Sequence, residues 1–249
     1  MSFVITVHIP EAIVMASDSR QSVNIEERAQ PEKDVSRIET ILSDFVFKTF
    51  HLSYQQVGIS AFGESLLGKV TTESHIKRFS EEDLDETDDV LNVPRKLLDY
   101  FQKRFPNADT AFHVSGFRKE GRSSVPYVFH CQVSRNEMIR VNLNPDKQEI
   151  IFGSSWGGQG DIMASLLQPV QILLPNGQME KVQRPPILWD AMSIQDAIDF
   201  SIHAVRTTIE TMRFQARPKN VGGAIDVLLL TPDGSKWIQR KNLHGERQS

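Results

Sequence analysis

The chain has almost no cysteine: Cys131 is the single one among 249 residues, so no disulfide can form within the chain. A sequence of this length with one thiol is typical of a reducing compartment, and we expect a cytoplasmic protein. No apolar run approaches the roughly 20 residues that span a bilayer, which predicts no membrane segment. A secretory signal peptide is not expected either, because the first residues carry no basic segment and include Glu11 and Asp18.

Positive charge is not in excess, because 28 Lys and Arg stand against 32 Asp and Glu, a net charge of −4. This balance gives no electrostatic reason to expect nucleic acid or an anionic membrane as a partner. The seven histidines show no zinc-binding spacing. The acidic run at 80–89 fits no calcium loop and is interpreted as a solvated linker. We therefore expect no metal and no cofactor.

Alternating apolar residues predict two strand pairs near the N-terminus, and Gly, Asn and Pro separate further short strands along the chain. The predicted strands cover 2–9, 12–17, 44–52, 55–62, 110–116, 125–133, 138–143, 149–152 and 223–231. Helices are predicted over 63–78, 93–105, 157–167 and 193–214, with a short one near 35–42. Because strands and helices do not alternate strictly, the order favours an α+β protein with two antiparallel sheets flanked by helices. No linker divides residues 1–249, which we expect to form one domain.

Ser2 is the first candidate for chemistry. A small residue after the initiator favours removal of Met1, which would leave Ser2 as the N-terminal residue. A serine hydroxyl is a weak nucleophile without a base, and a free α-amine with a pKa of roughly 7.7–8.0 can serve as that base. One residue would then supply both groups. The alternative is that the chain begins with Met-Ser for no catalytic reason.

Asp18 and Lys48 are the next candidates. Asp18 ends the second strand of the N-terminal hairpin, and the hairpin geometry predicts that it lies beside Ser2. Lys48 interrupts the apolar segment 44–52 and is expected either at a sheet edge or in a polar pocket. Beside Asp18, a buried lysine would help to lower the proton affinity of Ser2. The alternative for Asp18 is an ordinary turn at the end of a strand.

Three stretches together resemble one known family. They are SFVITVHIPEAIVMASDSR (2–20), KTFHLSYQQVGISAFG (48–63) and VGGAIDVLLLTPDG (221–234). In order and spacing they resemble the proteasome β-subunit-like N-terminal nucleophile hydrolases, which include the HslV-type peptidases. The resemblance implies a four-layer αββα sandwich of two antiparallel sheets flanked by helices. It covers both ends of the chain well and the middle only by the order of elements.

The resemblance assigns a role to each matching residue. Ser2, Asp18 and Lys48 fall on the catalytic positions of the family. Arg20 falls in the Asp-Ser-Arg stretch that resembles the end of the family's hairpin. The oxyanion donor falls on the backbone N–H of Phe62, or of Gly63 beside it. A supporting serine of the family falls in the Gly-rich segment 153–158, with Ser155 as the candidate.

The chain also departs from that family pattern. The nucleophile is Ser2 where the family usually has threonine, and Phe62 replaces a glycine, which would reshape the pocket. Pro218 and Val221 stand where the family has an aspartate and a serine. The expected activity is hydrolysis of an amide, in a peptide or a small molecule, by a ring-like homo-oligomer; the sequence leaves open whether an unfoldase is a partner. The alternative is a catalytically silent scaffold or binding subunit with the same fold.

Overall fold

The N-terminal hairpin lies at the centre of the protein. In the computed structural model, which describes residues 2–26, 37–182 and 185–243, strands β1 (Phe3–His8) and β2 (Ile13–Ser17) are buried along their whole length. Both faces of the hairpin are covered, which explains why its sequence is almost continuously apolar. The hairpin was predicted from its alternation and from the turn at Pro10, and the two strands pair in register from Val4–Ser17 to His8–Ile13.

The hairpin belongs to a five-stranded antiparallel sheet in the order β12-β1-β2-β15-β16. The remaining strands are β12 (Gly153–Gly158), β15 (Asp226–Thr231) and β16 (Gly234–Gln239). Helices α3 (Asp161–Leu167) and α4 (Ile194–Phe214) cover its outer face. A capping box between Ser193 and Asp196 begins α4, as the polar residues before this helix predict.

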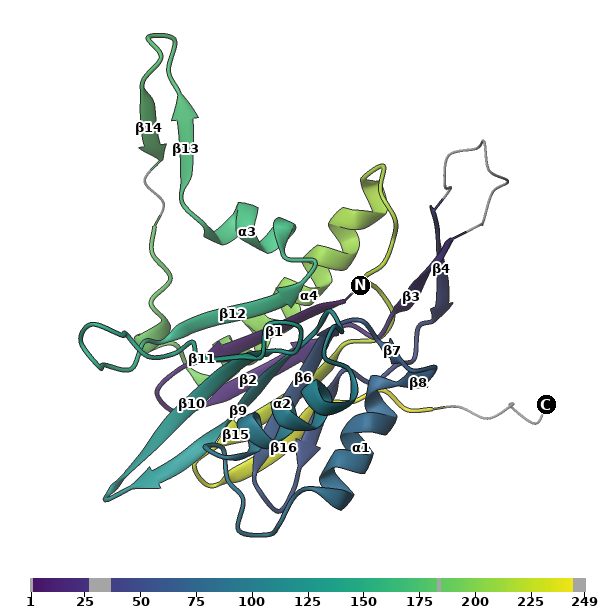
Figure 1. Cartoon of the computed structure of the whole chain (residues 1–249). Coiled ribbons are helices and arrows are strands. Elements are labelled where there is room, and N and C mark those ends of the chain that lie inside the picture. Colours follow the sequence, from purple (N-terminus) through teal and green to yellow (C-terminus); the bar gives the residue numbers. More distant parts are fainter. Residues whose placement is uncertain (1, 27–36, 183–184, 244–249) are drawn as a thin grey trace, which may run out of the picture.

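A second five-stranded antiparallel sheet has the order β11-β10-β9-β6-β5. Its strands are β5 (Thr49–Leu52), β6 (Val57–Gly63), β9 (Thr110–Glu120), β10 (Ser123–Gln132) and β11 (Glu137–Arg140). Helices α1 (Thr72–Glu82) and α2 (Val93–Arg104) pack on its outer face (Figure 1). The described part of the chain is therefore α+β, with four α-helices and antiparallel sheets, as predicted.

The two sheets face each other through an interface that changes in character along its length. At one end Ile13, Met15 and Leu228 form an apolar cluster. Towards the N-terminal residue the contacts become polar: Thr6 Oγ1 lies 3.1 Å from His113 Nδ1, and Thr49 Oγ1 donates to Ser17 Oγ at 2.9 Å. Burial lowers the pKa of His113 to about 3, so its imidazole is neutral in the folded protein.

Three small ribbons extend from this core. They are β3–β4 (Gln21–Glu26 and Arg37–Ser43), β7–β8 (Leu66–Leu67 and Val70–Thr71) and β13–β14 (Val170–Leu173 and Met179–Val182). Figure 1 shows β13–β14 reaching well away from the sheets. A short 3-10 helix, Trp189–Ala191, precedes α4. None of the described helices is long and apolar enough to cross a membrane.

Three local predictions were wrong. The helix predicted over 63–78 begins only at Thr72, because Gly63 ends β6 and the short ribbon β7–β8 comes before the helix. The short helix expected near 35–42 is the strand β4 from Arg37 onward, where Thr40 and Ile41 favour an extended chain and pair with β3; residues 35 and 36 lie outside the described residues. The Gly-rich segment 153–158, which no predicted strand included and whose last two residues fell in the helix predicted over 157–167, is the strand β12. It pairs with all six residues of β1, from Phe3–Gly158 to His8–Gly153.

Candidate active site

Asp18 is the residue that joins the separate parts of the candidate site. Its carboxylate is completely buried and accepts four hydrogen bonds. Oδ1 accepts from the backbone N–H of Phe3 at 2.9 Å and from Lys48 Nζ at 2.6 Å. Oδ2 accepts from the backbone N–H groups of Arg20 at 3.1 Å and Gly222 at 3.0 Å. One side chain thus ties together the first strand, the lysine strand and the C-terminal glycine pair.

Lys48 lies in the interior, not at an exposed sheet edge. Its backbone carbonyl accepts from the N–H of Ala61 at 2.8 Å, and Val46 two residues earlier donates to the carbonyl of Ser19 at 3.0 Å. These bonds direct the ammonium to Asp18, where the side-chain exposures of the pair are 5% and 0%. Burial lowers the pKa of Lys48, and the charge of Asp18 partly offsets this effect.

Ser2 directly precedes Phe3, whose backbone N–H donates to Asp18, and it lines the same cavity as Lys48. Ser2 is 3% exposed, and its carbonyl accepts a hydrogen bond from the backbone N–H of Gln159 at 2.7 Å. This contact requires glycine at position 158, which has φ +82° and whose Cβ would stand 1.9 Å from the Ser2 carbonyl oxygen. The hairpin therefore places Ser2 next to Asp18, as the sequence predicts. The removal of Met1 lies outside the described residues.

A small cavity of about 20 Å³ joins most of the predicted site residues. Its lining consists of Ser2, Val46, Phe47, Lys48, Ala61, Phe62, Gly63, Glu64, Ser65, Thr72 and Glu73. Both candidate oxyanion donors, Phe62 and Gly63, are thus brought to the same space as Ser2 and Lys48. Ser155 is not in this lining; it lies on β12 opposite Thr6.

Phe62 lines the same cavity as Ser2. It packs against Gly157, where an added Cβ would stand 2.4 Å from the ring. Its ring also contacts His113 and His130, with centroids 5.2 Å and 5.8 Å apart. The expectation that this phenylalanine reshapes the pocket agrees with the small volume that remains.

Arg20 supports the site from the side of Asp44. Its guanidinium donates to both carboxylate oxygens of Asp44, at 2.6 Å and 2.8 Å, and to the carbonyl of Lys219 at 2.9 Å. The Asp44 side chain raises the pKa of Arg20, which keeps the guanidinium charged. Gly222 leaves room for it, since a Cβ there would stand 2.6 Å from Cζ of Arg20. Asp44 was missed by the sequence analysis.

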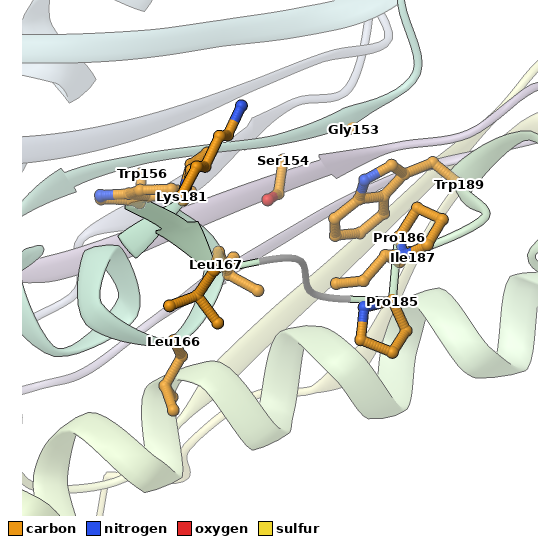
Figure 2. Close-up of a pocket in the computed structure, with 12 residues that line it drawn as sticks. Gly153, Ser154, Trp156, Leu166, Leu167, Lys181, Pro185, Pro186, Ile187 and Trp189 are labelled. Atoms are coloured by element: carbon orange, nitrogen blue, oxygen red, sulfur yellow. The ribbon is translucent and has the colours of Figure 1, made fainter. Parts of the chain in front are cut away.

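A much larger cavity lies elsewhere (Figure 2). It has a volume of about 770 Å³ and is bordered by β12, α3, the end of β14 and residues 185–189, with Trp156 and Trp189 among its lining side chains. None of the predicted site residues lines it. Within the described residues, no group of three or more His, Cys, Asp or Glu is arranged to hold a metal ion.

No protein-family model and no curated protein matches the chain. Solved structures do. A Gly-1 mutant of Anbu from Hyphomicrobium sp. strain MC1 matches 97% of this chain and 86% of its own, with a TM-score of 0.58 at 13% identity. Anbu from the same organism, in another crystal form, matches 96% and 88%, with a TM-score of 0.57 at 14% identity. At these identities the likeness shows the fold alone: the chain has a fold like that of Anbu.

These findings correct the expected family. The chain was assigned by resemblance to the proteasome β-subunit-like and HslV-type peptidases, but no family model supports that assignment, and the structural likeness is to Anbu. The motifs at the two ends of the chain describe how the hairpin, the lysine strand and Gly222 meet. That geometry belongs to the fold, and it is too general to identify one family within it.

Proposed function

We propose that the protein is an N-terminal nucleophile hydrolase that cleaves amide bonds with Ser2, after removal of Met1. One observation carries the proposal: the buried Asp18 carboxylate holds both the N–H of Phe3 and the ammonium of Lys48 on the same oxygen. A buried ion pair is costly to form and is a weak source of stability, so the presence of its lysine in the lining of the cavity that Ser2 also lines needs another explanation. Activation of the Ser2 hydroxyl supplies one.

The reaction would proceed through an acyl-enzyme. Ser2 Oγ attacks the amide carbonyl carbon while its proton passes to the free α-amine of the same residue. A backbone N–H of Phe62 or Gly63 stabilises the oxyanion. The carbon–nitrogen bond then breaks, the leaving amine takes the proton from the α-ammonium, and Ser2 carries an ester. Water, losing a proton to the α-amine, hydrolyses the ester and restores Ser2.

Lys48 and Asp18 would support these proton transfers. A buried ammonium lowers the proton affinity of the neighbouring hydroxyl and amine, and Asp18 fixes its position. We propose peptides or small amides as substrates, and one domain over residues 1–249 with the four-layer arrangement of helices and sheets found in N-terminal nucleophile hydrolases. The helices packed on the outer face of each sheet support that arrangement.

A catalytically silent scaffold is the second candidate, and one observation favours it. The cavity beside Ser2 holds about 20 Å³, which is room for a single water molecule and too little for a peptide. The hydrolase therefore requires the Phe62 or Phe47 side chain to move when a substrate binds. A scaffold requires no such movement.

Intact mass and a covalent probe decide between the two. The mass of the purified protein is measured by mass spectrometry before and after treatment with a serine-reactive β-lactone. The control is the Ser2→Ala variant, because its small second residue also favours removal of Met1. The hydrolase predicts a mass without Met1 and one adduct, which peptide mapping places on Ser2 and which the variant lacks. Retention of Met1, or a processed protein that forms no adduct, would favour the scaffold.

We also propose that copies of the chain associate through the β13–β14 hairpin. This projecting ribbon exposes 70% of Leu173 and 60% of Met179, and an isolated two-stranded hairpin is only marginally stable in water. A hairpin that packs on a different surface of its neighbour makes a heterologous contact, which can close into a ring. The Leu173→Lys/Met179→Lys variant is expected to have a smaller mass by light scattering than the wild type. Equal masses would contradict the proposal.

A cytoplasmic location completes the proposal. The single thiol, Cys131, is buried and free, which suits a reducing compartment. Fractionation of cells that produce the protein tests this location.

A further inference from the structure

A second buried ion pair lies next to the first. Lys241, just after β16, contacts the Asp226 carboxylate through its ammonium, and its backbone N–H donates to Asp226 Oδ1 at 2.8 Å. The two side chains are 2% and 0% exposed. Neither residue has a role in the proposed function. Because burying charges costs desolvation free energy, a second buried pair next to the first suggests a function for it.

The Lys241–Asp226 pair contacts the chain next to each member of the Asp18–Lys48 pair. Asp226 is opposite Ser17 in the first sheet, and Ser17 directly precedes Asp18. Lys241 Nζ lies 4.0 Å from the ring centre of Phe47, and Phe47 directly precedes Lys48. The C-terminal segment thus brings a positive charge to the strand that carries the lysine of the site.

The charges around the two lysines come from several elements. Lys48 faces Asp18 at the end of β2, Arg20 in the following loop, and Lys241. Lys241 itself faces Asp226 on β15, Glu73 on α1, and Asp18. Burial is the largest cause that lowers the pKa of Lys48, and the charge of Lys241 lowers it further.

Glu73 connects this second pair to the cavity. It begins α1 and lines the space beside Ser2. Its carboxylate accepts a hydrogen bond from the backbone N–H of Phe47. Burial raises the pKa of Glu73, and the positive charges of Lys241 and Arg240 oppose this effect. The segment before Lys48 is therefore held between an acidic side chain from α1 and two basic side chains from the C-terminal segment.

We propose that Lys241, held by Asp226, is a positioning residue of the Ser2 site, whose buried positive charge acts together with the Lys48 ammonium to favour the neutral form of the Ser2 α-amine. The inference rests on the proposed function. In that reaction the α-amine must accept a proton from Ser2 Oγ and then give it to the leaving group. A second cation near Lys48 disfavours protonation of the α-amine. This base is then unprotonated at neutral pH.

The test compares pH profiles of Ser2 acylation by the β-lactone. The double variant Lys241→Met/Asp226→Asn removes both charges, since replacement of a whole buried pair is tolerated better than removal of one partner. The acid limb of the pH profile of this variant is expected to move up by about 0.5–1 pH unit. At a given pH on that limb, acylation would be roughly 3- to 10-fold slower. An upward shift of under about 0.3 unit, or a downward shift, overturns the proposal.

A matched control removes an ion pair from another part of the protein. Lys96→Met/Asp88→Asn deletes the pair that Lys96 Nζ makes with Asp88 Oδ2 at 2.8 Å on α2. This variant is expected to keep the wild-type pH profile, and an equal shift in it would overturn the assignment to Lys241. If the Lys241→Met/Asp226→Asn variant does not fold, Lys241→Gln/Asp226→Asn replaces it, because two amides can hydrogen-bond to each other and leave no buried charge unpaired.

Failure of the inference can be distinguished from failure of the proposed function. If wild-type protein with a free Ser2 forms no adduct at any pH, the proposed function fails. The inference is then decided by titration of Lys48 itself, followed by the carbon-13 shift of its Cε. Removal of Lys241 and Asp226 is expected to raise the pH at which Lys48 titrates, and an unchanged titration overturns the inference.

Discussion

Replacement of Asp18 by asparagine is expected to lower the free energy of unfolding by about 3–5 kcal/mol. The neutral amide keeps the shape of the side chain but leaves the buried Lys48 ammonium without its counter-charge. Its NH₂ group would also face hydrogen-bond donors, because all four partners of the carboxylate donate to it. Each unmet donor in the interior adds to the cost. Thermal unfolding should show a midpoint lower by about 10 °C for a chain of this size.

Asp44→Asn is the matched control for this change. Asp44 also pairs with a basic side chain, but its side chain is 38% exposed and that of its partner Arg20 is 20% exposed. A partly solvated pair contributes about 1 kcal/mol or less, so the midpoint should fall by no more than a few degrees. Similar losses in the two variants would mean that Asp18 does not have the central structural role described above.

Replacement of Lys48 by methionine is expected to slow acylation of Ser2 by at least about 100-fold. Methionine fills a similar volume but carries no charge, so the positive charge in the cavity that lowers the proton affinity of the hydroxyl and the α-amine is lost. The rate constant for adduct formation with the β-lactone measures the effect. Circular dichroism and thermal unfolding establish that the variant is folded.

The control for Lys48→Met is Lys96→Met, which removes a lysine that pairs with Asp88 outside the cavity. That variant should react at the wild-type rate. A folded Lys48→Met protein that is acylated within about threefold of the wild-type rate, well under the usual contribution of a proton-transfer group, would exclude Lys48 from the reaction.

Local patterns predicted the parts of the site that neighbouring residues determine. The hairpin has a period of two and a tight turn, so the distance from Ser2 to Asp18 follows from the number of residues between them. The apolar context of Lys48 similarly indicated two alternatives, and the buried one is present. These features depend on short-range spacing alone, which a single sequence contains.

The missed features depend on long-range pairing. Strand β12 is rich in Gly and Ser, which have little strand propensity, and it is extended because β1 offers it a free edge. Asp44 and Lys241 are isolated charges whose partners lie 24 and 15 residues away. No local pattern marks them, so only the folded chain reveals their contacts. The family assignment was wrong for a related reason: short motifs at the two ends describe a fold that more than one family can share.

The dependence of Asp18 on Gly222 has a consequence for protein synthesis. Residue 18 leaves the ribosome long before residue 222, which supplies one of its four hydrogen bonds, and β1 must wait for β12 to cover its outer edge. A growing chain therefore carries Ser2 without the surroundings that would activate it. In the proposed reaction the chemistry becomes available only after residue 222 has been made, so a translation product that ends before Gly222 is expected to be inert.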